Sequence, residues 1–205
     1  MNNEVLKRRR SRARTFTAAG VTFGAALVVA FAILAAFGAL GVVRDLHAGS
    51  PAVTTSTDQL AARFAVLRRR HSNQCALKPQ SVDSLAVRGR LQGSCCTPIV
   101  FRHYVKQVRG LAAYRTLTQI PRDPYDIPVA QARQLLAYDR KIALIPEQQA
   151  VYREAMKVAD EHGPCCCHCW RWTTFEGQAK YLISRRGYTS RQIATVWDLE
   201  DGCGG

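Results

Sequence analysis

The sequence predicts an all-α protein in which one N-terminal transmembrane helix precedes a compact multi-helix extracytoplasmic domain. Three observations support this prediction. An uncharged apolar run lies near the N-terminus, apolar residues recur at three- and four-residue spacing through most of the remaining chain, and no stretch shows the two-residue period of a strand convincingly. With 205 residues and a hydrophobic content of 47%, the chain can bury one core besides the membrane segment.

The predicted membrane helix covers residues 15–43, TFTAAGVTFGAALVVAFAILAAFGALGVV, which contain no charged side chain. A helix needs about 20 apolar residues to cross the hydrocarbon layer. This run of 29 is therefore long enough to span it with some tilt. The apolar region of a cleaved signal peptide is shorter, about 7 to 15 residues, and ends in an A-x-A site. No clear site of that kind closes this run, so we expect an uncleaved signal-anchor.

The charges on either side of this run predict its orientation. Six basic residues lie within residues 1–14, whereas only Arg44 and Asp45 follow the run directly. By the positive-inside rule, residues 1–14 are a basic cytoplasmic N-terminus and the later residues lie outside the cytoplasm. The expected location is therefore the cell membrane, as a single-pass protein whose partner is the lipid bilayer.

The rest of the chain predicts a linker and a domain. The stretch HAGSPAVTTST, residues 47–57, is small, polar and turn-prone, so we predict a linker over residues 44–56 between the bilayer and a domain over residues 57–205. Apolar spacing in this domain predicts six helices, over residues 58–70, 98–114, 128–144, 146–162, 172–186 and 190–199.

Helix boundaries follow from capping residues. Thr57 and Ser190 are the predicted N-caps of the first and last helices, and a proline begins each of the second, third and fourth. Gly163 and Gly187 each follow the end of a helix, where glycine commonly occurs. The stretch RDPYDIP, residues 122–128, is rich in turn formers and is predicted to be a structural turn.

The net charge of +14 separates into two parts. The basic residues before the membrane helix are explained by topology. The remaining excess is spread along the exported part rather than gathered in a block, so it predicts a solvated basic surface. Nucleic acid is not an expected partner of such a domain.

The eight cysteines all lie in the predicted outward part of the chain. They are Cys75, Cys95, Cys96, Cys165, Cys166, Cys167, Cys169 and Cys203. An oxidising compartment favours disulfides, but adjacent cysteines bridge each other only through a strained ring. A disulfide framework would therefore have to pair the clustered cysteines with distant ones.

A metal site uses the same spacing differently, because thiolates bind Cu(I) and Zn(II). In an extended loop Cys165, Cys167 and Cys169 project to one side, while Cys166 and His168 project to the other. In a helix, Cys165 and Cys169 share a face, with Cys166 beside them. His168 or Cys203 could complete a tetrahedral set in either case.

Two further ligand candidates come from elsewhere in the chain. Cys95 and Cys96 precede a predicted helix start, where the dipole and free amides lower a thiol pKa, so they form a second candidate pair. Cys203 lies between glycines, which allow the backbone to approach closely, and so can fold back onto the cluster.

The cluster resembles the PCYCGC-motif family of membrane-attached, exported bacterial proteins. Pro164, Cys165, Cys167 and Cys169 fall on the Pro-Cys-Tyr-Cys-Gly-Cys run, whereas Cys166 and His168 replace its tyrosine and glycine. The resemblance covers about residues 152–193 and also includes Tyr152, Ala155, Ala179, Lys180, Gly187 and Ile193. It implies an exported thiol or metal site carried on helices, and it implies location more firmly than activity.

Three functions follow from these observations. The first is a membrane-anchored protein that binds a soft metal ion, copper or zinc, through the C-C-C-H-C cluster. The alternatives are a disulfide-stapled interaction domain without metal and a thiol redox protein, although no C-x-x-C lies in a βαβ setting. No carboxylate pair, Ser/His/Asp set or phosphate loop supports hydrolase or kinase chemistry, so no catalytic residue is assigned.

Overall fold

The structure, a computed structural model, describes residues 56–204. The predicted membrane helix over residues 15–43 and all but the last residue of the predicted linker lie outside the described residues. Within residues 56–204, no helix combines the length and the apolar character that a membrane span requires.

The described residues are mostly helical, as predicted, and hold seven α-helices, one 3-10 turn and two short strands. The helices are α1 (Thr57–Leu67), α2 (Pro79–Ser84), α3 (Phe101–Leu111), α4 (Val129–Lys141), α5 (Pro146–Val158), α6 (Trp170–Arg186) and α7 (Ser190–Glu200). The 3-10 turn η1 is Ala112–Tyr114, and the strands are β1 (Arg90–Gln92) and β2 (Asp126–Pro128).

The first and last helices begin one residue earlier than their predicted caps imply. Ser56 caps α1: its Oγ accepts the Gln59 N–H at 3.2 Å, and the Gln59 side chain accepts the Ser56 N–H at 3.1 Å. Thr189 caps α7 in the same reciprocal way with Gln192. The glutamine at the third helical position selects the cap, because it completes both hydrogen bonds. Helix α6 ends at Gly187, as predicted.

One predicted boundary of each of three other helices was wrong, and long-range hydrogen bonds explain two of these differences. Helix α3 begins at Phe101, not at residue 98, because residues 95–100 pair with the C-terminal tail instead. Helix α5 ends at Val158 rather than residue 162. Its next turn does not form because the Asp160 N–H is donated to Asp198 Oδ1, at 3.0 Å. Helix α4 ends at Lys141, three residues before the predicted end.

The sequence did not predict the small sheet or α2. Strands β1 and β2 pair antiparallel, with Leu91 opposite Ile127. Each strand has three residues, too few for an alternating pattern to be recognised. Part of the predicted turn over residues 122–128 is thus strand β2.

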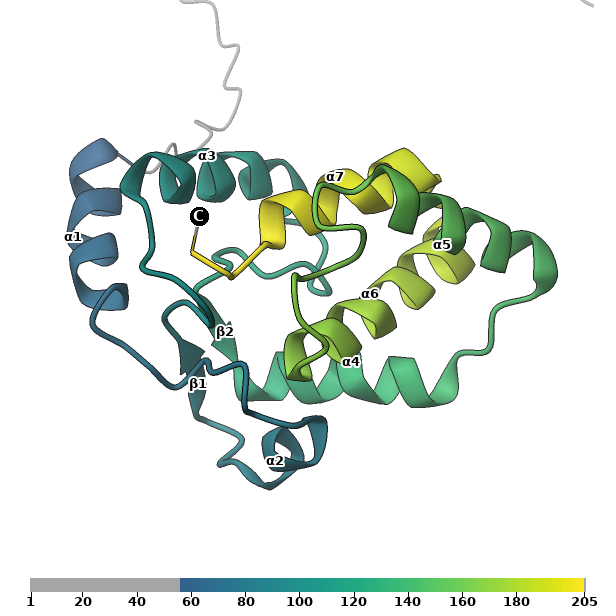
Figure 1. Cartoon of the computed structure of the whole chain (residues 1–205), viewed down its shortest axis with the longest axis horizontal. Coiled ribbons are helices and arrows are strands. Elements are labelled where there is room, and N and C mark those ends of the chain that lie inside the picture. The colour runs from purple at the N-terminus through teal and green to yellow at the C-terminus, as the bar shows by residue number, and fades with distance from the viewer. Residues whose placement is uncertain (1–55, 205) are drawn as a thin grey trace, which may run out of the picture. The chain divides into compact units, whose positions relative to one another are not determined.

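The main core lies where α6 packs against α4, and where α7 packs against α3 and α5. Figure 1 shows α6 running between α4 and α5. Trp170 at the start of α6 and Trp197 on α7 are both fully buried. A smaller apolar cluster joins α1 to α3 and includes Leu60, Leu67 and Tyr104.

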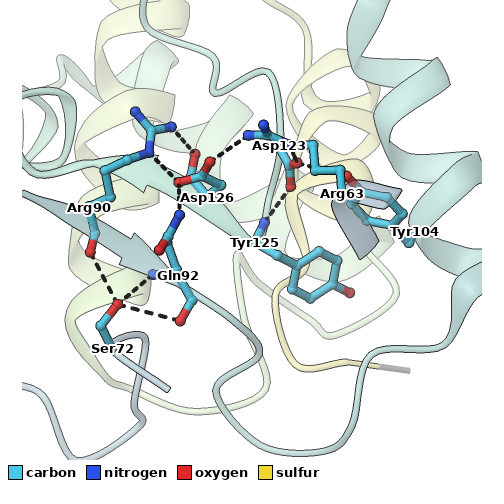
Figure 2. Close-up of polar contacts among 8 residues, drawn as sticks. All are labelled: Arg63, Ser72, Arg90, Gln92, Tyr104, Asp123, Tyr125 and Asp126. Atoms are coloured by element: carbon cyan, nitrogen blue, oxygen red, sulfur yellow. Dashed lines mark hydrogen bonds and ion pairs between the residues drawn. The ribbon is translucent and has the colours of Figure 1, made fainter. Parts of the chain in front are cut away.

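A partly buried ion-pair network connects α1 to the sheet (Figure 2). Arg63 on α1 donates from Nε to Asp123 at 2.6 Å and from Nη2 to Asp126 at 2.5 Å. Asp126 also accepts from Arg90 on β1, and Asp123 accepts from the Tyr104 hydroxyl at 2.9 Å. Both carboxylates are nearly inaccessible, so the network fixes the position of β2 beneath α1.

Candidate metal centre

Four separate loops bring seven of the eight cysteines together. Cys75 lies between α1 and α2, and Cys95 and Cys96 lie between β1 and α3. Residues 165–167 supply three more from the loop between α5 and α6, and Cys203 follows α7. No helix or strand contributes a thiol to this cluster, so the loops must be held in place by other contacts.

The C-terminal tail is held against the loop before α3. Cys95 N–H donates to the Gly202 carbonyl at 2.9 Å, and Thr97 N–H donates to the Cys203 carbonyl at 2.8 Å. Gly204 has φ +112, and a Cβ at this residue would come within 2.1 Å of the Thr97 carbonyl oxygen. Only glycine fits this close approach. The tail therefore folds back and carries Cys203 into the cluster.

A second set of bonds holds the Cys75 loop against the start of α6. The buried Asn73 side chain accepts from Trp170 Nε1 at 3.1 Å and donates to the Gly93 carbonyl at 2.8 Å. The Trp170 N–H donates to the Leu77 carbonyl at 3.2 Å. These bonds flank Cys75 on both sides and tie its loop to β1 and α6.

The thiols are in direct contact. The Cys75 Sγ lies 3.0 Å from that of Cys96 and 3.1 Å from that of Cys167. The Cys203 Sγ lies 2.8 Å from Cys166 and 3.5 Å from Cys165. Two further pairs continue the chain of contacts: Cys96 with Cys166 at 3.4 Å and Cys95 with Cys203 at 3.7 Å. All eight cysteines are free in the structure.

Within residues 56–204, four groups of thiols could each hold a metal ion. In each group the Sγ atoms lie within 4.8 Å of one another. The groups are Cys75, Cys95, Cys96 and Cys167; Cys95, Cys165 and Cys203; Cys96, Cys166 and Cys203; and Cys165, Cys166 and Cys167. The cluster could therefore hold a metal ion, as the sequence predicted.

The C-C-C-H-C stretch adopts neither of the two predicted conformations. Residues 162–169 form a succession of bends, which turn the thiols of three consecutive cysteines into one group. His168 stacks on Trp172 instead, with ring centroids 3.8 Å apart. Cys169 is buried at the N-terminus of α6. Neither His168 nor Cys169 belongs to a metal-holding group of the described chain.

Of the predicted ligands, the structure brings together Cys95, Cys96, residues 165–167 and Cys203. It also brings in Cys75, which was not predicted as a ligand. In the sequence it was a candidate only for a disulfide framework, as one of the distant cysteines that could pair with the clustered ones. The pKa values of Cys95 and Cys96 are raised, not lowered as their predicted helix-start position implied. Helix α3 begins several residues later, and hydrogen bonds with neighbouring thiols and burial favour the protonated forms.

Two buried thiols, those of Cys165 and Cys203, have lowered pKa values. A hydrogen bond from Cys169 lowers the pKa of Cys165 to about 6, and hydrogen bonds from Cys165 and Cys95 lower the pKa of Cys203 to about 4. These two thiols are therefore the ones in the cluster whose deprotonated form is favoured, and the thiolate is the form that binds metal. Cys96 and Cys166 are exposed, so ions can reach the cluster from solvent.

Arg171 supplies a buried positive charge next to these thiols. Its side chain is fully buried, and it donates from Nη1 to the Pro124 carbonyl at 2.9 Å and from Nη2 to the Glu200 carbonyl at 2.5 Å. Burial alone would lower its pKa, but the nearby Cys165 thiol, whose deprotonated form is favoured, and the nearby Asp201 carboxylate raise it. Its Nε has no hydrogen-bond partner within the described residues, and no carboxylate there forms a salt bridge with it. Cys165 and the Asp201 carboxylate therefore supply negative charge near this guanidinium without forming a salt bridge with it.

Comparison with known proteins finds no matching family model, no matching curated protein and no matching solved structure. The resemblance to the PCYCGC-motif proteins therefore stays a prediction.

Proposed function

We propose that this protein is a membrane-anchored metal-binding protein whose extracytoplasmic domain binds soft ions, copper or zinc, through its thiol cluster. The observation that carries the proposal is the convergence of seven thiols from four loops into groups that each fit an ion. A structural core of this size has no need for seven adjacent thiols, whereas soft metal ions bind preferentially to thiolates.

The chemistry of the surroundings also favours a metal over uncharged thiols. A fully buried arginine without a carboxylate ion-pair partner among residues 56–204 is costly unless an anion lies close by. Metal binding keeps the thiols deprotonated and so maintains that anion.

Membrane attachment rests on the sequence of residues 15–43 and on the basic residues before them. Protease added outside the cell, or outside spheroplasts, should digest the domain and leave residues 1–14 protected. Protection of the domain from external protease would contradict this orientation.

The metal is tested on the full chain, purified in detergent without reductant or chelator. Elemental analysis measures bound copper and zinc, and alkylation with mass spectrometry counts free thiols. We expect stoichiometric metal and thiols that become free only after chelation. A protein without metal whose cysteines are paired in disulfides would contradict the proposal and support the interaction domain.

Two variants sharpen this test. Replacing Cys95, Cys166 and Cys167 with serine leaves at most two thiols in every group, so zinc should be lost and the amount of bound copper should fall sharply. Cys169→Ser is the matched control: Cys169 belongs to no group, and a serine hydroxyl can still donate the hydrogen bond to Cys165, so this variant should keep its metal. Circular dichroism shows whether both variants retain their helices.

A further inference from the structure

The four thiol groups are connected in a regular way. Each pair of groups shares one cysteine, and six cysteines each belong to two groups. The shared residues are Cys95, Cys96, Cys165, Cys166, Cys167 and Cys203, whereas Cys75 belongs to one group alone. This is the relation between the four corners and the six edges of a tetrahedron: each group is a corner, and each shared thiol is an edge.

We propose that the site holds four Cu(I) ions in one cluster, with one ion in each group and the six shared thiolates bridging the ions in pairs. The inference rests on the proposed function, and it adds the identity, the number and the arrangement of the ions.

The distances fit such a core. A metal–sulfur bond of about 2.3 Å places two thiolates on one ion within about 4 Å of each other. Two thiols of one group lie at 3.5 Å in the pair Cys95–Cys96 and at 3.4 Å in the pair Cys96–Cys166. The shortest such distance, between Cys166 and Cys203, is 2.8 Å, so binding needs outward movements of about 1 Å in the loops that carry them.

The number of ligands distinguishes Cu(I) from Zn(II). In a thiolate-bridged cluster each Cu(I) ion is bound by three thiolates, the number that three of the four groups offer. Zn(II) in structural sites takes four ligands in a tetrahedron, and only the group that contains Cys75 offers four. One zinc ion fits the site, whereas four do not.

The net charge of the cluster also favours Cu(I) over Zn(II). Four Cu(I) ions with six thiolates carry a net negative charge, which the buried guanidinium of Arg171 partly offsets. Four Zn(II) ions with all seven thiolates would carry a net positive charge beside the same buried cation, an unfavourable arrangement.

The experiment titrates the full chain, reduced and in detergent under anaerobic conditions, with Cu(I) buffered by a competing chelator. We expect four ions per chain to bind cooperatively. X-ray absorption should show about three sulfur ligands per copper, together with copper–copper scattering.

Two single variants test the arrangement. Cys166→Ser removes an exposed thiol shared by two groups and leaves each of them with two thiols, so the four-copper species should be lost. Cys75→Ser leaves three thiols in its group and should still bind four ions. Circular dichroism checks the helicity of both variants. Each substitution is also combined with Cys169→Ser, so that Cys166→Ser and Cys75→Ser are compared in a second background.

The outcomes separate the two proposals. One zinc or one copper ion per chain, without copper–copper scattering, would overturn the cluster and leave metal binding in place. Equal loss of copper in Cys75→Ser and Cys166→Ser would also overturn the bridging arrangement. A chain that binds neither ion after full reduction would overturn both.

Discussion

Gly202 lies directly against the guanidinium group of Arg171: a Cβ at Gly202 would come within 2.3 Å of the Arg171 Cζ. The two residues thus join the C-terminal tail to the start of α6, and the thiol cluster lies next to this contact.

The first prediction concerns Gly202→Ala. Arg171 is fully buried and held by two carbonyls, so it cannot move aside, and the tail that carries Cys203 has to move instead. Overpacking of this kind costs about 1–3 kcal/mol. We expect this loss in urea unfolding, together with reduced copper binding.

Gly187→Ala is the matched control for Gly202→Ala. Gly187 has φ +65, so alanine there costs about 1 kcal/mol, but no atom within 4 Å opposes its methyl group. This variant should lose stability and keep its copper. If both variants keep their copper equally, the contact with Arg171 does not position Cys203.

The second prediction concerns the charge of Arg171. In Arg171→Met the carbonyls of Pro124 and Glu200 lose their donors, so unfolding should need about 2–4 kcal/mol less. Loss of the cation beside the thiolates should weaken Cu(I) binding about 10- to 100-fold in a chelator competition. Arg171→Lys keeps the charge and should recover part of the affinity. Equal affinities in the two variants would show that the charge is not used.

The third prediction concerns the ion-pair network. Asp126→Asn weakens the ion pairs with Arg63 and Arg90. The Asp126 side chain is almost completely buried, so these pairs are poorly replaced by water. We expect a loss of about 2 kcal/mol in urea unfolding. Asp83→Asn removes the exposed pair with Arg140 and should change stability by less than about 1 kcal/mol. A similar small change in both would mean that the network contributes no more than a surface pair.

The fourth prediction concerns pH. Burial raises the pKa of Glu200 well above its ordinary value, while its Oε1 accepts from Gln178 at 2.6 Å. The protonated form is therefore favoured in the folded protein. Its stabilising effect is full below the unfolded pKa of about 4.3 and is lost as the pH rises through the folded pKa.

Glu200→Gln mimics the protonated form, so its stability relative to the original protein should increase as the pH rises from about 4.3. Urea midpoints of the reduced, metal-free chains measure this difference. Glu154→Gln, an exposed change on α5, should give a difference that does not change in this way with pH. A constant difference for Glu200→Gln would contradict the burial argument.

The helices could be predicted from sequence because their signals are local. Capping residues, prolines and apolar spacing lie within each helix, so the existence of α1, α3, α4, α5, α6 and α7 follows from the sequence. The boundary near Phe101 could not be predicted in this way. It depends on hydrogen bonds between residues 95–100 and a tail about a hundred positions away.

That the thiols form a cluster able to hold a metal ion was predictable, but the arrangement of this cluster was not. Adjacent thiols indicated the cluster, and the glycines beside Cys203 indicated that it could fold back. The inclusion of Cys75 and the orientation of His168 onto Trp172 depend on how four loops meet. The role of Asp126 was missed because its partners, Arg63 and Arg90, are 63 and 36 positions away.

The contacts between thiols join residues that are far apart along the chain. Cys75 touches Cys167 across 92 positions, and Cys95 touches Cys203 across 108. A cross-link that closes a loop of 100 residues removes about 4.7 kcal/mol of unfolded-state entropy at 25 °C. Ions bound in this cluster would act as several such cross-links at once. Metal release would thus loosen both ends of the helical domain together, making its thermal stability a direct readout of metal supply.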